Sequence, residues 1–361
     1  NYTLVQQTED HRSGLYEINL PSDAKYGDGP ALLALLQGTP RQVGQAYADL
    51  LGDKVEFLYD TWLSMKVPNV VERDVVGLLL DWLWDEGLSD FTPEEFKEEL
   101  EGMKENAGKH RDLTKKALRI VSLSNLPADT QNIERVILDL ILHGKSGAAD
   151  RLRQAHSLLD VESDEELVKV AASMIKSKPD HAPGYCDYFA VWGEHTVDGR
   201  LFSSRNLDFD RDIKVSTGKL ITVVRYAGNN SVPYFTAGTP GYWGALAGAS
   251  AAGITVSQAN LDNSDVSFRG IAWPLRLRQI LAQSNSLADA RAIWKAAPNT
   301  GAFNFLVASA SDVNTTANGL LDETVTEAAM ALETTFHHTS AFTGNDPIED
   351  AATFHCSCTL V

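Results

Sequence analysis

The chain has 361 residues, of which 43% are hydrophobic and 22% charged, a balance typical of a globular protein long enough for two domains. Its 31 basic and 49 acidic residues give a formal net charge of −18, which disfavours binding to nucleic-acid phosphates and to anionic lipid. No run of about 18 apolar residues is present, so we expect no transmembrane segment.

The first half of the chain is predicted to be mostly helical, from residue 31 to about residue 178. Apolar side chains recur there at helical spacing, and Thr92 followed by Pro93 is typical of a helix start. The predicted helices include residues 42–62, 75–84, 129–143 and 163–178.

From residue 188 the pattern changes to strands mixed with helices, which predicts an α+β fold. The turn Val197-Asp198-Gly199 is typical of a hairpin and is expected to join the first two strands. The predicted strands are residues 188–196, 200–207, 219–226, 253–258 and 303–308, and the predicted helices are residues 271–284 and 287–297.

A short linker that contains proline and glycine, residues 180–185, separates the two halves, and Cys186 follows it directly. Loops of this composition are readily cut. A cut between Tyr185 and Cys186 would give Cys186 a free α-amino group, whose ordinary pKa of about 8 allows it to act as the base for its own thiol. We therefore divide the chain into residues 1–185, a mostly helical propeptide or α-subunit-like segment, and residues 186–361.

Arg205 and Asp208 follow Cys186 at a spacing that a hairpin would fold back beside it. A cation there stabilises a thiolate, and a carboxylate can accept a hydrogen bond from a terminal ammonium. Taken singly, each residue has a simpler interpretation. A cysteine at a strand start is often a small apolar residue, and an Arg and an Asp three positions apart are often a surface ion pair.

The segment that begins at Cys186, CDYFAVWGEHTVDGRLFSSRNLDFD, resembles the nucleophile hairpin of the N-terminal-nucleophile (Ntn) amidases. This superfamily includes the choloylglycine hydrolases, acid ceramidase, N-acylethanolamine acid amidase and the penicillin acyltransferases. Their pattern is a cysteine, an apolar strand, an Asp-Gly-type turn, and R-N-x-D before an aromatic residue. The stretch AVWG at residues 190–193 and the long helical segment before Cys186 are most similar to the penicillin-acyltransferase branch.

The resemblance implies an Ntn αββα sandwich, in which two antiparallel sheets lie between helical layers, for residues 186–361. It also implies that Cys186 is both nucleophile and base, that Arg205 is the assisting cation, and that Asp208 is the orienting carboxylate. We expect either that a further segment follows Val361 or that this member lacks part of its site.

A second stretch, GALAGASAAGITVSQAN, resembles the family's strand pair that ends in an oxyanion-hole asparagine, here Asn260. Ala249 or Ser250 stands where relatives often have Asn. The alternative is that Asn260 is an ordinary turn residue after a strand. The family has a second such asparagine in a T-N context, which this sequence does not show, since Asn345 has different surroundings.

Tyr242 and Trp243 are candidates for the lining of a substrate pocket, although aromatic residues in such a loop often only anchor a turn. The pairs Cys356–Cys358 and His337–His338 lack further ligands at useful spacing, so we expect no metal and no cofactor. Three sequons predict glycosylation at Asn1, Asn229 and Asn314, and favour a secreted or lysosomal protein, although a cytoplasmic location stays open.

The resemblance thus implies an autocatalytically processed amidase or acyltransferase, whose small-molecule N-acyl amide substrate reacts through an acyl-thioester. The two cleaved fragments could associate with each other. The alternative is a non-catalytic Ntn-fold protein that serves as a structural or binding component of an extracellular or organellar assembly. A Cys/His protease is disfavoured because no papain-type or caspase-type sequence surrounds Cys186.

Overall fold

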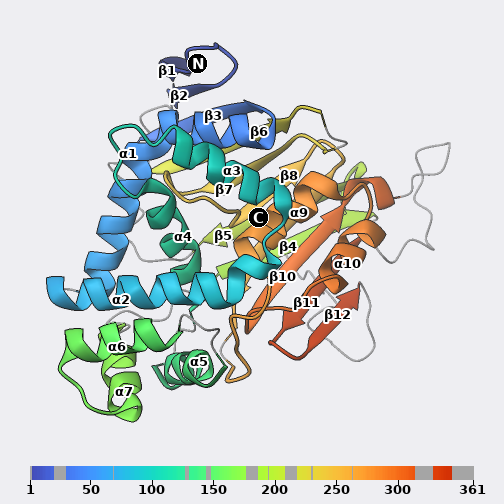
Figure 1. Cartoon of the computed structure of the whole chain (residues 1–361). Helices are drawn as coiled ribbons and strands as arrows, with labels where there is room; N and C mark the ends of the chain where they lie inside the picture. Colours follow the sequence, from blue (N-terminus) through green and yellow to red (C-terminus); the bar gives the residue numbers. More distant parts are fainter. Residues whose placement is uncertain are drawn as a thin grey trace.

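The described residues form a mixed α+β fold with a large sheet, a two-stranded sheet and helices (Figure 1). The computed structural model describes residues 2–19, 30–67, 69–126, 130–143, 148–175, 186–193, 195–207, 218–228, 231–261, 263–313 and 328–343. None of the described helices combines the length and the apolar character needed to cross a membrane.

The large sheet has ten strands in the order β1-β2-β3-β6-β7-β8-β9-β10-β11-β12. Neighbouring strands are antiparallel, apart from the parallel pair β3 and β6. Their bounds are β1 Tyr2–Gln7, β2 Gly14–Ile18, β3 Ala31–Gly38, β6 Lys219–Tyr226, β7 Tyr234–Gly238, β8 Ala247–Ser250, β9 Ile254–Asn260, β10 Phe303–Ser309, β11 Ala329–Thr334 and β12 Thr339–Thr343.

The sequence predicts a helix from residue 31, and this prediction is wrong for the first eight residues, which form β3. Leu32, Ala34 and Leu36 are buried and alternate with more exposed residues, as in a strand, but a short apolar run alone does not distinguish strand from helix. Because β3 pairs with β6, the first half of the chain contributes strands to the same sheet as the second half. The division at residue 185 stays a prediction about processing.

The predicted helices are confirmed, with bounds that differ by a few residues. Thr39 and Gln42 form a capping box at the start of the first helix, where each side chain accepts from the other residue's backbone N–H. Thr92, by contrast, caps nothing: Pro93 holds the cap position, and the Thr92 hydroxyl donates to the Leu88 carbonyl at 2.9 Å.

The helices are α1 Pro40–Lys66, α2 Val70–Leu83, α3 Glu94–Glu105, α4 Leu113–Ser124, α5 Thr130–His143, α6 Ala148–Leu159, α7 Asp164–Met174, α9 Trp273–Gln283 and α10 Leu287–Lys295, with a π-helical turn at Trp84–Leu88 and 3-10 turns at Ser89–Phe91 and Ala310–Asp312.

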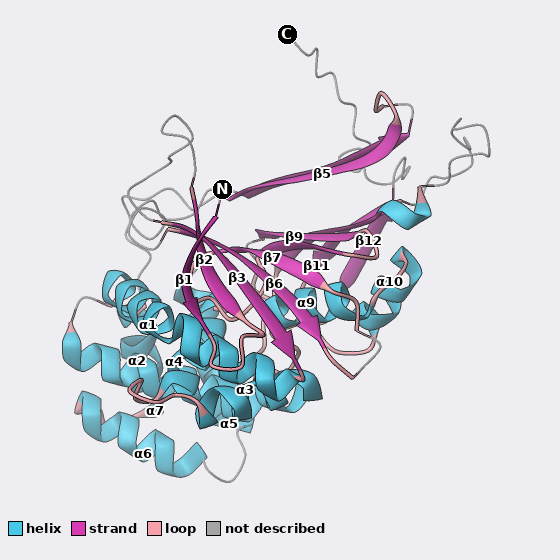
Figure 2. Cartoon of the chain, turned by 90° about the horizontal axis from the view of Figure 1, so that it is seen from above, coloured by secondary structure: helices cyan, strands magenta, loops and turns pink. Residues whose placement is uncertain are grey.

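The two-stranded sheet is the predicted hairpin of β4 (Cys186–Gly193) and β5 (Gly199–Leu207). It lies on one face of the large sheet, and the helices lie on the other (Figure 2). Ala190 of β4 packs in a small cluster with Leu306, Ala308 and Ala329 of the large sheet. The described elements therefore form three layers: helices, the large sheet and the hairpin.

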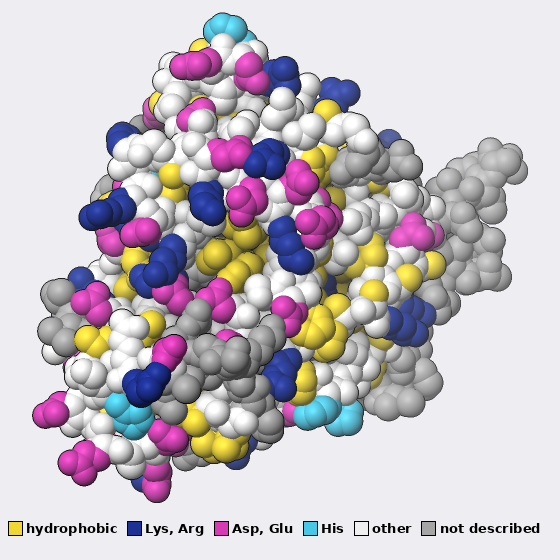
Figure 3. Space-filling view, in the orientation of Figure 1, with side chains coloured by type: hydrophobic (Ala, Val, Ile, Leu, Met, Phe, Trp, Pro, Cys, Tyr) yellow, Lys and Arg dark blue, Asp and Glu magenta, His cyan; other side chains and the backbone are white. Residues whose placement is uncertain are grey.

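The surface seen in Figure 3 mixes charges of both signs: described Lys and Arg side chains lie among Asp and Glu side chains. Some of the described surface charges are paired across elements, as Arg41 of α1 is with Glu105 of α3. On this face, positive charge is therefore balanced by negative charge nearby.

A buried ion pair joins the first half of the chain to the second. Arg278 of α9 donates from Nη1 to Glu99 Oε2 at 3.0 Å and from Nη2 to Glu99 Oε1 at 2.8 Å, and the two side chains are 5% and 1% exposed. The Tyr226 hydroxyl and the Trp243 indole N–H also donate to Glu99, the latter at 2.7 Å, and Arg278 Nη2 donates to the Tyr234 hydroxyl at 2.8 Å. The network thus satisfies both buried charges, as burial of charge requires.

Glu99→Gln keeps the side-chain shape but leaves the buried Arg278 guanidinium without its counter-charge. We expect the free energy of unfolding to fall by about 3–5 kcal/mol, the usual cost of breaking a buried pair on one side. Urea unfolding followed by circular dichroism measures this change. Glu98→Gln, the same substitution at the exposed neighbour, is the matched control and should unfold as the wild type does. Equal urea midpoints for all three proteins would contradict the prediction.

Candidate active site

Cys186 is the first residue of β4, and its thiol is free and half-buried. In the hairpin register, Cys186 lies opposite Leu207, and Tyr188 lies opposite Arg205. Because alternate residues of a strand share a face, the side chains of Cys186, Tyr188 and Arg205 lie on the same face of the hairpin. That face is turned toward the large sheet. Ala190, four residues after Cys186 and therefore on the same face of β4, packs against the large sheet.

The predicted contact between the cation and the thiol is present: Arg205 Nη2 donates to Cys186 Sγ at 3.5 Å. Burial lowers the pKa of Arg205, while the nearby Cys186 and Tyr242 act in the opposite direction. A guanidinium stays protonated in proteins, so its charge is available to stabilise a thiolate here. The arrangement can therefore activate a sulfur nucleophile.

Strand β9 holds the Arg205 side chain in place. Arg205 Nε donates to the backbone carbonyl of Gln258 at 2.9 Å, and Arg205 Nη2 lies 3.5 Å from Gln258 Oε1. Gln258 Nε2 in turn donates to Asn260 Oδ1 at 2.9 Å. One chain of contacts thus joins Cys186, Arg205 and Asn260.

Gln258 is a member of the site that sequence reasoning missed. Its one available signal was its position two residues before Asn260, since residues at that spacing share a face of a strand. Asn260 itself is the last residue of β9, is exposed, and pairs with Phe303 of β10. It lies at a strand end, where its side chain can reach solvent or a ligand.

Tyr242 and Trp243 are both buried, at 8% and 1% exposure. Tyr242 lies near Arg205, and its hydroxyl donates to Ser124 Oγ at the end of α4, at 3.1 Å. Trp243 instead belongs to the buried network around Glu99. A role in a substrate pocket stays a prediction for both residues.

The other predicted site residues lie outside the described part of the chain. These are Tyr185 on the cleavage side, the carboxylate Asp208, and the three sequon residues Asn1, Asn229 and Asn314. Their roles stay predictions.

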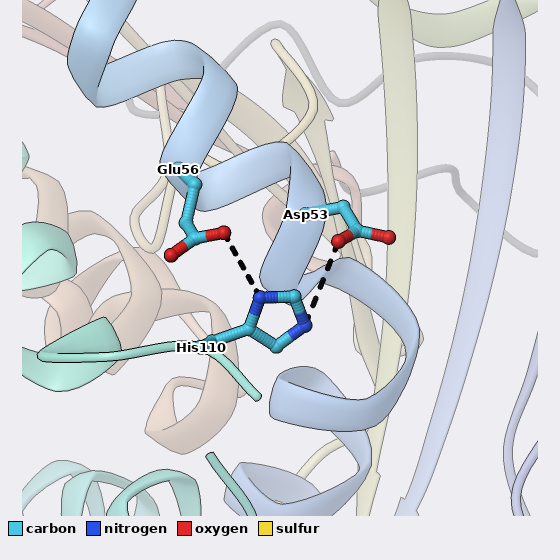
Figure 4. A group of neighbouring side chains, drawn as sticks. All are labelled: Asp53, Glu56 and His110. Atoms are coloured by element: carbon cyan, nitrogen blue, oxygen red, sulfur yellow. Dashed lines mark hydrogen bonds and ion pairs between the residues drawn. The ribbon is translucent and has the colours of Figure 1, made fainter. Parts of the chain in front are cut away.

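A second cluster of titratable groups lies between α1 and the segment before α4, where His110 stands between Asp53 and Glu56 (Figure 4). His110 Nδ1 lies 3.0 Å from Glu56 Oε2, and its Nε2 lies 3.7 Å from Asp53 Oδ1. Lys116 lies 3.0 Å from Glu56, and Lys109 lies 3.1 Å from Asp53. Because each carboxylate already has a lysine partner and the two ring nitrogens face different carboxylates, the group fits an ion-pair network better than a metal site.

Comparisons with known proteins give distant similarity to solved structures. No family model matches the chain, and no curated protein matches it. Among solved structures, the chain is similar to a mutant conjugated bile acid hydrolase from Clostridium perfringens, with a TM-score of 0.29 and 15% sequence identity over 45% of this chain and 51% of that chain. The chain spans about half the length of that protein.

Arg205→Met removes the charge beside the thiol but keeps much of the side-chain volume. We expect alkylation of Cys186 by iodoacetamide at neutral pH to slow about tenfold, equivalent to about 1.4 kcal/mol of charge interaction. Mass spectrometry of the peptide that contains Cys186 measures the rate separately from that of the other cysteines. Arg200→Met, at an exposed position of the same strand, is the matched control. An unchanged rate in Arg205→Met would contradict a role for this cation.

Proposed function

We propose that the protein is a cysteine Ntn hydrolase that is cut between Tyr185 and Cys186 and then cleaves a linear N-acyl amide. The observation that carries the proposal is the 3.5 Å contact between Arg205 Nη2 and Cys186 Sγ, at the first residue of a strand. A thiol at that position, once it begins a chain, has its base in its own α-amino group, and the guanidinium supplies the stabilising charge.

The processing step uses the same sulfur. Cys186 Sγ attacks the carbonyl carbon of Tyr185, and the amide nitrogen leaves as the α-amino group of Cys186 in an N-to-S acyl shift. Water then attacks the resulting thioester, which releases the carboxylate of Tyr185 and restores the thiol. The products are a chain that ends at Tyr185 and a chain that begins at Cys186.

In the proposed turnover, the α-amino group takes the thiol proton and the thiolate attacks the substrate carbonyl. The tetrahedral oxyanion accepts a hydrogen bond from the Asn260 amide, a contribution of about 3 kcal/mol for such donors. The substrate amine leaves with the proton from the α-ammonium, and water or a second amine resolves the acyl-thioester. Asp208 is proposed to accept from the ammonium and so to orient it.

We further propose that the hairpin belongs to the second sheet of an αββα sandwich. In support, the hairpin packs face to face on the large sheet, and α9 contacts β7, β8 and β9. On the outer face of the hairpin, Phe189 and Phe202 are 46% and 55% exposed, which suits a face that another layer covers. A secreted or lysosomal location, with glycosylation at the sequons, is part of the same proposal.

N-terminal sequencing of the purified protein tests the processing step. We expect a second N-terminus at Cys186 in the wild type, and a single uncut chain in Cys186→Ala because the attacking sulfur is absent. Cys358→Ala, which removes a different cysteine, is the matched control and should be cut as the wild type is. A wild-type chain that stays intact at both acidic and neutral pH would contradict the proposal and favour the non-catalytic alternative.

A further inference from the structure

We infer that Gln258 is a positioning residue that orients the Asn260 amide toward the oxyanion and couples it to Arg205, an inference that rests on the proposed function. The contacts that carry it run from Arg205 Nη2 to Gln258 Oε1, at 3.5 Å, and from Gln258 Nε2 to Asn260 Oδ1, at 2.9 Å. Gln258 touches both site residues without itself contacting the thiol.

The guanidinium determines which way both amides point. Arg205 has only donors, so the Gln258 atom that faces it must be the carbonyl oxygen, and the NH₂ group must lie on the other branch. That NH₂ group faces Asn260, so the Asn260 atom that accepts its hydrogen bond must be the side-chain oxygen. The Asn260 NH₂ group consequently points away from Gln258, where it can donate to a substrate oxyanion. A reversed Asn260 would present an acceptor to a developing negative charge.

Burial makes the arrangement rigid. Gln258 is 3% exposed near the end of β9, and the residues two and four positions before it, Val256 and Ile254, are buried and apolar. A primary amide in such surroundings is costly unless its polar atoms are paired. Its side-chain partners are Arg205 and Asn260, so the residue's polarity is explained by the site and not by the core.

Two reactions of Cys186 separate a positioning role from a merely structural one. Acylation by p-nitrophenyl butyrate passes through an oxyanion, whereas alkylation by iodoacetamide does not. In Gln258→Met, which has a similar length but no amide, we expect the burst of p-nitrophenolate to slow about tenfold because Asn260 is no longer held. Alkylation should stay within about twofold of the wild type, since Arg205 keeps its bond to the Gln258 backbone carbonyl.

A double variant tests the coupling. Asn260→Ala alone should slow acylation about a hundredfold, as loss of an oxyanion donor does, and adding Gln258→Met should slow it no further. Gln258→Glu is the second variant: its carboxylate accepts from Arg205 but cannot donate to Asn260, so acylation should fall at least as far as in Gln258→Met. Gln279→Met, where a half-buried glutamine donates to Gln283 one turn along α9, is the matched control. Thermal unfolding checks that each variant is folded.

Three results would overturn the inference: normal acylation in both Gln258 variants, equal slowing of acylation and alkylation, or losses that multiply in the double variant. A wild type that gives no burst above the Cys186→Ala background is a different failure. It would overturn the proposed function, and the inference would fall with it.

Discussion

The buried carboxylate of Glu99 is the interaction on which the rest of the structure depends. It lies on α3, in the first half of the chain, and receives hydrogen bonds from Arg278, Tyr226 and Trp243, all in the second half. Trp243 is preceded in the chain by Tyr242, which lies near Arg205 and donates to Ser124 of α4. Helices α3 and α4 thereby hold the loop of Tyr242 and Trp243 through hydrogen bonds. If the chain is cut before Cys186, this ion pair would lie between the two fragments and favour their association.

The site follows from the way in which the hairpin packs on the large sheet. The alternation of side chains along β4 and β5 turns Cys186 and Arg205 toward the sheet, while the close packing of Ala190 brings the hairpin within reach of β9. Arg205 then bridges the layers by its bond to the Gln258 carbonyl. The contact with sulfur is thus a product of register and layer packing together, and a one-residue shift of β4 against β5 would put Cys186 and Arg205 on opposite faces of the hairpin.

The hairpin and the pair of site residues on it could be predicted from the sequence, because the patterns that indicate them are local. The hairpin, its turn and β6 follow from two-residue alternation and an Asp-Gly turn, and the cysteine–arginine pair follows from the hairpin. β3 could not be predicted, since an apolar run of six residues suits a strand or a helix and its parallel partner β6 lies far along the chain. Glu99 was missed for the same reason, since its partners Arg278, Tyr226 and Trp243 come from distant segments. Gln258 lies two residues from Asn260, but its contact with Arg205 joins segments 53 residues apart, which no local pattern encodes.

The central claim is that Cys186 forms an acyl-thioester through its sulfur. The most direct measurement is mass spectrometry of the protein quenched in acid during reaction with p-nitrophenyl butyrate. We expect a butyryl adduct on the fragment that begins at Cys186, located on Cys186 and not on Cys356 or Cys358. Neutral hydroxylamine should remove it, as it removes a thioester. No adduct on Cys186, or an adduct spread equally over the three cysteines, would contradict it.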